Sequence, residues 1–523
     1  MPQRPDILIV TTDQQRTDTL SCYGAGYTHT PHIDRLARDG IRCDRAYCAN
    51  PVCTPARVSL FTGLQVNRHG SWNIGTHTRE SLTTLADRLA GEGYRTHYVG
   101  KIHFQPWHGP PDQSREHAFA VGPGMRKPPL LDPDDREPPY AGPYYGFQTI
   151  EWSSGHTING MTGHYGRWLR DHQGVSRETF QAWQQAASRS ESPFGGEARD
   201  WALPTACHQS TWAAERAIAF LDGQPDDEPF CLAIGFQDPH HPHALPEDFE
   251  DRVDPADVPV PTVSEDALAQ KPPHYRLAHR GEADTRGDPD RPLDNRLMGQ
   301  LGGFDYSAVS EHDLREARAY YYSMMRLIDR EWGRILAKLE ARGQLDNTLI
   351  IFTSDHGELL GDHGLWLKGP FPLEPLIRVP LLLHWPAGLP GRTVLTDIIS
   401  HVDLAGIIAE AAGLALPADA HDGCVTLDAL RTGTSGRTDA LVECVDNLRD
   451  LRLKTLVTPD RKLTWYQDRD YGELYHLDTD PGEALNRWDD PGCAEEKARL
   501  LGRLLGRLEP LEAANRSPRP GPA

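Results

Sequence analysis

Apolar residues follow two alternating patterns along the chain, short continuous runs and helical periodicities. Four runs have the length of buried strands, at residues 7–12, 96–99, 230–236 and 348–354. Elsewhere apolar positions and turn signals predict helices at residues 31–39, 55–63, 82–90, 211–221 and 314–339. Strands that alternate with helices predict an α/β fold, in which a large, mostly parallel sheet is sandwiched by helices.

Two of the predicted helices carry start and stop signals. Thr30 suits the N-cap of the first helix, Pro31 suits its first position, and Gly40 suits its end. In the longest helix, Ser310 with Asp313 three positions later matches a capping box. These signals predict where both helices begin.

The remaining segments divide the chain into predicted domains. Residues 105–205 and 244–305 are rich in turn-forming and aromatic residues, so we expect surface loops that wall a pocket. Short alternating segments at 453–458 and 462–466 predict a small antiparallel sheet, closed by a helix at 494–508. We therefore expect a large α/β domain over residues 1–430, a small α+β subdomain over 431–510 and a disordered tail over 511–523.

The composition of the chain limits which cellular compartment and which binding partners we expect. The chain has 523 residues and no apolar run long enough for a transmembrane helix or a signal peptide, so we expect a cytoplasmic protein. Nine cysteines without paired spacings favour free thiols. A formal net charge of −21 argues against nucleic acid or a membrane surface as partner. A small anionic substrate stays compatible, because a few converging cations can create a local positive site.

Polar side chains of metal-binding or cationic type follow each of the four predicted strands. In an open α/β sheet, ligands bind at the carboxyl ends of the strands. The residues beyond these ends are Asp13 and Gln14, Lys101 and His103, the histidines His240, His241 and His243, and Asp355 and His356, with Lys368 further on. Four strand ends of this kind predict one shared site.

Asp13, Gln14, Asp355 and His356 offer three oxygen ligands and one nitrogen ligand. This set suits a single divalent cation. Alternatively, an aspartate after a strand caps the next helix or turn, which is the better explanation for either aspartate alone. The two adjacent pairs together favour the metal site.

Residues 53–57, Cys-Thr-Pro-Ala-Arg, carry the most specific chemical signal. Pro55 in the first turn places Cys53 at a helix N-terminus, where free N–H groups favour anions. Arg57, one turn later, lies on the same face and can clamp an oxyanion. A buried structural cysteine is the plainer alternative. A phosphatase thiolate needs its arginine six residues on, and Cys43, Cys48 and Cys53 lack the nearby fourth cysteine of an iron–sulfur site.

This Cys-x-Pro-x-Arg element resembles the recognition motif of the type I sulfatases, in the alkaline phosphatase superfamily. Further similar segments lie at 62–63, 69–70, 100–103, 354–358 and 471–486. The similarity extends over about residues 5–490 and is weakest in the two expected loop regions. It implies hydrolysis of sulfate monoesters to an alcohol and inorganic sulfate.

The resemblance implies that Cys53 is oxidised to formylglycine by a formylglycine-generating enzyme. One hydroxyl of the hydrated aldehyde then attacks sulfur, and the other re-forms the carbonyl and expels sulfate. It also implies one divalent cation, with calcium favoured and manganese as the alternative. The implied ligands are an oxygen at position 53 together with Asp13, Gln14, Asp355 and His356.

The remaining roles also follow from the resemblance. Arg57 and Lys101 stabilise the hydrate, and His103 forms a hydrogen bond to it. Lys368 and His240 flank the sulfate and the leaving oxygen, and one of them protonates the departing alkoxide. His240 is chosen among the neighbouring histidines because it keeps the family's Pro-His-x-Pro context.

Two departures from the family pattern keep other functions open. Gln14 stands where many sulfatases have a second acid, and His356 stands where they have asparagine. The same combination resembles phosphonate monoester hydrolases, so a phosphonate monoester or phosphodiester hydrolase is the alternative. A binding protein without turnover would lack a ligand or the nucleophile, and a two-metal phosphatase would need serine or threonine at position 53. The alcohol half of the substrate and the oligomeric state, a homo-oligomer included, stay open.

Overall fold

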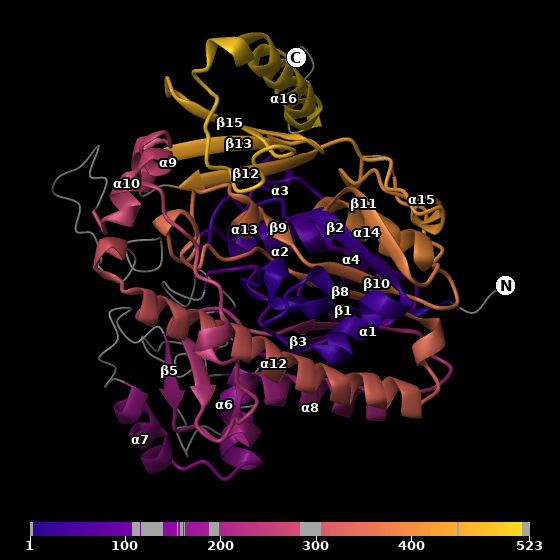
Figure 1. Ribbon diagram of the computed structural model, residues 1–523. Helices are drawn as coiled ribbons and strands as arrows, with labels where there is room; N and C mark the ends of the chain where they lie inside the picture. The colour runs from indigo at the N-terminus through magenta and orange to yellow at the C-terminus, as the bar shows by residue number, and fades with distance from the viewer. Residues whose placement is uncertain are drawn as a thin grey trace, which may run out of the picture.

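The computed structural model describes residues 4–106, 116, 140–153, 155–156, 161, 163–187, 198–282, 305–417, 419–446 and 449–514. Its centre is a nine-stranded sheet with helices on both faces (Figure 1). The strands are β1 (Asp6–Thr12), β2 (Ile41–Tyr47), β3 (Arg95–Gly100), β4 (Thr149–Trp152), β6 (Phe230–Gly235), β8 (Thr348–Ser354), β9 (Arg378–Val379), β10 (Leu381–His384) and β11 (Thr393–Ser400). The order is β11-β2-β10-β8-β1-β6-β3-β4, and β9 pairs with β2.

The sheet is mostly parallel, as the alternation of strands and helices predicts. β1 lies parallel to both β6 and β8, and β3 lies parallel to β6 and β4. At the other end β11 is parallel to β2, whereas β10 runs antiparallel to β8 and β2. The carboxyl ends of β1, β3, β6 and β8 therefore meet at one edge.

Helices cover both faces of this sheet (Figure 1). One face packs against α1 (Pro31–Asp39), α8 (Gln209–Asp222) and α12 (Glu311–Ala341), and the other against α2 (Cys53–Thr62), α4 (Leu85–Gly91) and α14 (His401–Ala411). Along β1 the side chains alternate: Leu8 and Val10 belong to the first core, and Ile7 and Ile9 belong to the second. Burial of each such side chain contributes roughly 1.5–3 kcal/mol.

The helix signals in the sequence are confirmed with one difference. Ser310 caps α12 in a capping box with Asp313. Thr30, Pro31 and Gly40 occupy the predicted cap and end positions of α1, but the Thr30 hydroxyl makes no capping hydrogen bond. It donates to Asp34 instead, at 3.1 Å. Proline at the first position leaves one N–H fewer to satisfy there.

The two segments expected to be irregular contain regular structure, so that expectation is wrong for much of their described part. The first holds β4, α6 (Gly163–Asp171), α7 (Arg177–Ala187) and β5 (Ala198–Trp201), and the second holds β7 (His243–Pro246), α9 (Glu265–Ala269) and α10 (Pro273–His279). Helix α6 contains two glycines, which weaken its helix signal. Tyr165, Trp168 and Leu169 nevertheless form one buried stripe in the core on the α8 side. Other parts of both segments lie outside the described residues.

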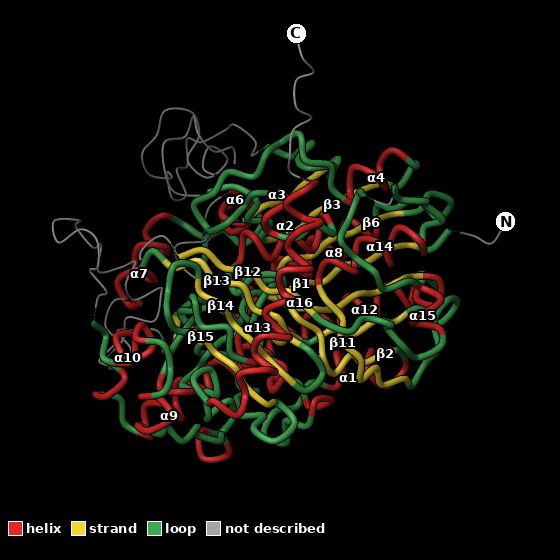
Figure 2. The backbone as a smooth tube through the Cα atoms, turned by 90° about the horizontal axis from the view of Figure 1, so that it is seen from above, coloured by secondary structure: helices red, strands yellow, loops and turns green. Residues whose placement is uncertain are grey.

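The C-terminal unit is the predicted small antiparallel sheet with a closing helix. It comprises β12 (Ala440–Asp446), β13 (Leu451–Val457), β14 (Arg461–Tyr466), β15 (Gly472–His476) and α16 (Ala494–Ala514), which packs on the sheet through leucines. Figures 1 and 2 place this sheet beside α13 (Glu374–Ile377), where Lys462 pairs with Glu374 at 3.3 Å. Helix α16 runs past its predicted end into the expected tail, and residues 515–523 lie outside the described part. None of the helices in that part has the length and apolar character needed to cross a membrane.

Candidate active site

The predicted site residues come together at the carboxyl ends of four strands. Asp13 and Gln14 follow β1, Lys101 and His103 follow β3, His240 lies beyond β6, and Asp355 and His356 follow β8. Cys53 at the start of α2 and Lys368 reach the same cluster, with Lys368 Nζ 2.9 Å from Cys53 Sγ. All of these side chains are buried. The fold thus brings together in one cluster the residues that follow the four predicted strands.

Four of these residues could hold a metal ion. One ligand atom from each of Asp13, Cys53, Asp355 and His356 lies within 4.8 Å of the others. His356 Nδ1 is 2.8 Å from the carbonyl oxygen of Gly357, so Nδ1–H donates there and Nε2 keeps its lone pair. That Nε2 lies 3.3 Å from Cys53 Sγ. Two carboxylates and an oriented imidazole fit one divalent cation.

Gln14 is held in a strained conformation beside this group. Its φ of 67° is in the left-handed region, which costs a non-glycine residue roughly 1–3 kcal/mol. The backbone N–H of Gln14 donates to Asp355 Oδ1 at 3.0 Å, and its side-chain Nε2 donates to Glu358. The amide Oε1 is buried and has no hydrogen-bond partner in the described part of the chain. An orphaned amide oxygen of this kind suits a metal ligand.

Glu358 is a supporting residue that the sequence reasoning included only as part of a motif. Its carboxylate accepts from Gln14 and from the backbone N–H of Leu360, the latter at 2.9 Å. Burial raises the pKa of this carboxyl group above its ordinary value. The carboxylate is a hydrogen-bond partner that fixes the orientation of the Gln14 amide.

Helix α2 places Cys53 at its N-terminus, as Pro55 in the sequence predicts. Val52 is extended at the N-cap, Cys53 is the first helical residue, and Pro55 lies in the first turn, where its missing N–H costs nothing. The helix ends at Gly63, which adopts a left-handed conformation with φ of 71°. Cys53 is only 1% exposed, so its sulfur faces the cluster and not bulk solvent.

Two lysines make the surroundings of Cys53 positive. Lys101 Nζ lies 3.8 Å from the Cys53 sulfur and 2.5 Å from Asp13 Oδ2. Burial and Asp13 raise the pKa of the Cys53 thiol, but Lys101, Lys368 and His356 outweigh them and lower it to about 6. Burial opposes the charge of Lys368, yet Cys53, Asp13 and Asp355 raise its pKa above the ordinary value. An anion at position 53 is therefore stabilised.

Arg57 connects the two carboxylates and uses three of its five N–H groups in buried contacts with protein oxygens. Its Nε donates to Asp355 at 2.8 Å, one terminal nitrogen donates to Asp13 at 3.0 Å, and the other donates to the Lys101 carbonyl at 2.8 Å. The guanidinium is fully buried. This geometry differs from the expected oxyanion clamp, because Arg57 holds the carboxylates in place; direct contact with a hydrate at position 53 stays a prediction.

The histidines beyond β3 and β6 have different surroundings. Both ring nitrogens of His103 lack hydrogen-bond partners among the described residues, and burial with Lys101 holds its pKa well below the ordinary range. His240 Nδ1 donates to the carbonyl of His241 at 2.5 Å, which leaves Nε2 for another partner. His243 packs away from the cluster, near Tyr321 and Trp366. The choice of His240 over His241 and His243 for proton transfer stays a prediction.

Comparisons with known proteins identify the family. The sulfatase family model matches residues 5–414, and the model of the C-terminal region of N-sulphoglucosamine sulphohydrolase matches residues 361–509. The chain belongs to the sulfatase family. It is a sulfuric ester hydrolase of the alkaline phosphatase superfamily.

Proteins similar to this sulfatase are named as enzymes of different specificity. An arylsulfatase of Clostridium perfringens is 25% identical over 97% of this chain and 95% of its own length. A choline-sulfatase of Rhizobium meliloti is 26% identical over 95% of this chain and 85% of its own. The phosphonate monoester hydrolase of Agrobacterium radiobacter shares the fold, with a TM-score of 0.73, 24% identity and coverage of 97% and 96%.

His156 is a residue of the sulfatase site that sequence reasoning missed. It lies four positions after β4, at the same edge as the other strand ends, and its Nε2 is 2.9 Å from Lys101 Nζ. The interpretation of residues 105–205 as loop concealed the short strand before it. A histidine soon after an apolar pair at 150 and 152 was the available signal.

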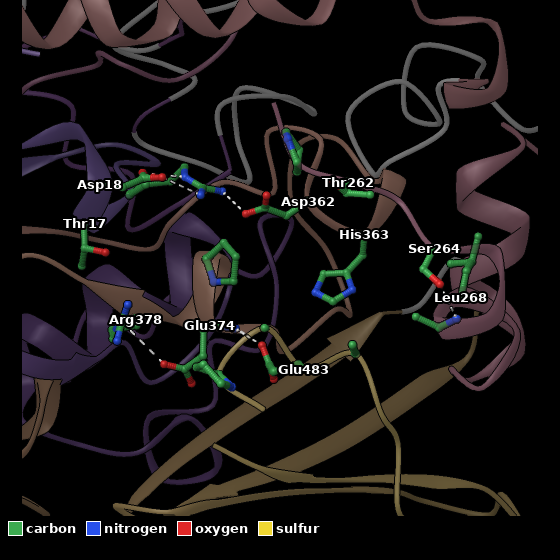
Figure 3. A pocket seen from close by; sticks show the side chains of 17 residues that line it. Thr17, Asp18, Thr262, Ser264, Leu268, Asp362, His363, Glu374, Arg378 and Glu483 are labelled. Carbon is green, nitrogen blue, oxygen red and sulfur yellow. Dashed lines mark hydrogen bonds and ion pairs between the residues drawn. The ribbon is translucent and has the colours of Figure 1, made fainter. Parts of the chain in front are cut away.

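A separate cavity lies between the large domain, α9 and the C-terminal unit of the sulfatase (Figure 3). It has a volume of about 340 Å³, and its walls include Asp362, Glu374, Arg378 and Glu483. Arg16 connects this cavity with the segment that follows Asp355 and His356. It donates to Asp362 at 2.7 Å and to the Glu358 carbonyl at 2.9 Å. None of the predicted site residues lines this cavity.

Proposed function

We propose that this sulfatase hydrolyses sulfate monoesters to an alcohol and inorganic sulfate by means of formylglycine at position 53 and one divalent cation. The observation that carries the proposal is the position of Cys53 Sγ. It lies at a helix N-terminus, 3.5 Å from Asp13 Oδ1 and 3.3 Å from His356 Nε2, with Lys368 at 2.9 Å. A nucleophile here would face cations on one side and metal ligands on the other.

Asp13, Gln14, Asp355 and His356 would hold the cation, together with the side chain at position 53. Three oxygens favour calcium, and the imidazole makes manganese the alternative. When bound, the cation neutralises and orients the anionic ester. Arg57 keeps both carboxylates aimed at one point, since its guanidinium bonds to each of them.

Conversion of Cys53 by a formylglycine-generating enzyme would supply a hydrated aldehyde as the nucleophile. A sulfate ester reacts through a loose transition state, and charge moves onto the leaving oxygen. Lys101 and Lys368 stabilise negative charge around position 53, which is the electrostatic requirement of such a reaction. Both lysines are buried, so water screens them little.

Lys368 and His240 are the two candidates for protonation of the leaving oxygen. Burial lowers the pKa of Lys368, but Asp13 and Asp355, which stay in place after conversion of Cys53, raise it and keep the ammonium charged. Burial lowers the pKa of His240 well below its ordinary value, so its ring is neutral before substrate arrives. Lys368 therefore holds a proton in the free enzyme, and His240 could shuttle one through Nε2.

Hydrolysis of phosphonate monoesters is the second candidate function. It is favoured by the ligand set, because the Asp13-Gln14 and Asp355-His356 pairs resemble those of phosphonate monoester hydrolases. The fold shared with a phosphonate monoester hydrolase is compatible with it. Both reactions need the same nucleophile and the same cations, so the ester preference separates them.

Mass spectrometry of the peptide that contains Cys53 tests the proposed nucleophile. We expect an aldehyde or its hydrate in protein produced together with a formylglycine-generating enzyme. Cys53→Ala should abolish turnover and keep the fold, whereas Cys424→Ala, at an exposed thiol, should retain full turnover. Full activity of Cys53→Ala would disprove the proposal.

A further inference from the structure

Three imidazole rings form a continuous stack at the edge of the active site. The rings of His156 and His240 lie with centroids 3.5 Å apart and planes 4° from parallel. The rings of His240 and His241 follow at 4.0 Å and 25°. We call these three residues the histidine stack. Its members come from two segments, 155–156 beyond β4 and 240–241 beyond β6.

His156 also contacts the charged part of the site. Its Nε2 lies 2.9 Å from Lys101 Nζ, and an ammonium group can only donate, so Nε2 is the acceptor. The other contacts of this ammonium are Asp13 Oδ2 at 2.5 Å and Cys53 Sγ at 3.8 Å. His156 thus gives the Lys101 ammonium a neutral acceptor in addition to the Asp13 carboxylate, and the two contacts together restrain its position.

The same ring restrains His240. The hydrogen bond from Nδ1 to the His241 carbonyl fixes one edge of the His240 ring. Stacking on the His156 ring fixes the plane of the His240 ring. Rotation of the His240 ring about its Cβ–Cγ bond would break both contacts. His240 Nε2, which carries no proton while Nδ1–H donates to the carbonyl, is thereby held in a single direction, so that it can take up the Lys368 proton and pass it to the leaving oxygen.

We propose that His156 is a positioning residue that orients Lys101 through its ring nitrogen and His240 through its ring face. The proposal rests on the proposed function, since the value of both orientations lies in sulfate binding and in protonation of the leaving oxygen. It makes two separable predictions, because one contact uses a lone pair and the other uses an aromatic face.

Two substitutions separate these contacts. His156→Phe keeps the aromatic face and removes the acceptor, so kcat/KM should fall about tenfold to a hundredfold for every sulfate ester. Inhibition by inorganic sulfate should weaken in parallel. His156→Gln keeps an acceptor near the Nε2 position and removes the face. Its kcat/KM should fall at least about tenfold more for an alkyl sulfate than for 4-nitrophenyl sulfate, because only the poor leaving group needs the proton.

His172→Gln at an exposed position is the matched control and should leave both esters unaffected. Equal losses for both esters in both variants, or losses below about twofold, would overturn the proposal. Crystal structures of the two variants give a readout independent of turnover. We expect Lys101 to move in His156→Phe and the His240 ring to turn in His156→Gln. If the wild-type enzyme cleaves no sulfate ester, the proposed function fails, and unmoved side chains would then also refute the positioning role.

Discussion

At the scale of single residues, Arg57 shows how one side chain stabilises two buried carboxylates. Its planar guanidinium reaches Asp13 and Asp355 together, and all three groups have no solvent exposure. Lysine has the same charge but one point of contact, so it could neutralise only one carboxylate. The second carboxylate would lose its guanidinium contact, which leaves Asp13 with Lys101 or Asp355 with backbone N–H groups.

Arg57→Lys should therefore lower the free energy of unfolding by ~3 kcal/mol in chelator-treated protein. Excess calcium should restore part of this loss, because a divalent cation replaces the missing contact. Urea unfolding with and without calcium measures both effects. Arg38→Lys, at a pair with Asp39 on the surface, should leave the urea unfolding midpoint unchanged. An equal effect at both arginines would contradict the bridging role.

Much of the candidate site could be predicted at this scale, because residues after parallel strands meet at one sheet edge. Asp13, Asp355 and His356 belong to this group. The bridge made by Arg57 could not be predicted, since its partners lie 44 and 298 residues away in sequence. His156 was missed because β4 is a four-residue edge strand that only its pairing with β3 defines, and this pairing is a property of the assembled sheet.

At the scale of elements, helix α2 sets the position of Cys53, and Gly63 fixes where that helix ends. Gly63 has a φ of 71°, and a Cβ added there would lie 3.0 Å from the Cβ of Ala405 in α14 and 2.8 Å from that of His421. Gly70, which ends α3 (Val66–His69), has a similar φ of 77° but nothing within 4 Å. The two glycines thus share the backbone requirement and differ in crowding.

Gly63→Ala should destabilise the protein by about 2–4 kcal/mol, the sum of left-handed strain and crowding against α14. Gly70→Ala should cost only the backbone part, about 1 kcal/mol. Thermal unfolding of both variants measures the difference. We also expect lower turnover for Gly63→Ala alone, since α2 carries Cys53 into the cluster. Equal stabilities of Gly63→Ala and Gly70→Ala would show that α14 moves to make room for the added methyl group without loss of stability.

The predicted elements were correct where the pattern was long and regular, as in α12 and β8. Helix α6 was missed because Gly163 and Gly166 weaken its local preference, and its stability comes from the Tyr165 ring, whose centroid lies 5.4 Å from that of Trp212 in α8. The antiparallel strand β10 was also absent from the prediction. Its four residues give no periodicity, and only the neighbours β8 and β2 define it.

At the scale of the whole molecule, buried polar contacts join the C-terminal unit to the large domain. Glu473 of β15 accepts from Tyr275 of α10 at 3.1 Å and from Tyr475 at 2.6 Å. Lys462 of β14 forms a buried ion pair with Glu374 of α13 across the boundary and a second one with Glu483 inside the C-terminal unit. The contacts from Tyr275 to Glu473 and from Lys462 to Glu374 cross between the two units, and each pairs polar groups that the folded chain buries. The C-terminal unit is therefore part of the same folded body.

The charge of the molecule is opposite in sign to that of its site. The chain has a formal net charge of −21, yet around Cys53 the carboxylates of Asp13 and Asp355 face Arg57, Lys101 and Lys368. Gln14 and His356 add no negative charge, and a bound divalent cation would increase the positive surplus. The site is thus a local exception in an acidic protein, suited to a small anion.

This surplus predicts an order of ester preference. A sulfate monoester carries one negative charge in its reacting group, which the cations can stabilise while charge develops on the leaving oxygen. A phosphonate monoester monoanion has the same charge and should be the slower second substrate. A phosphate monoester dianion should turn over weakly, because its product would be held too tightly. Values of kcat/KM for one leaving group across the three esters measure this order. A phosphonate advantage of about tenfold, worth ~1.4 kcal/mol in the transition state, would reverse the two candidate functions.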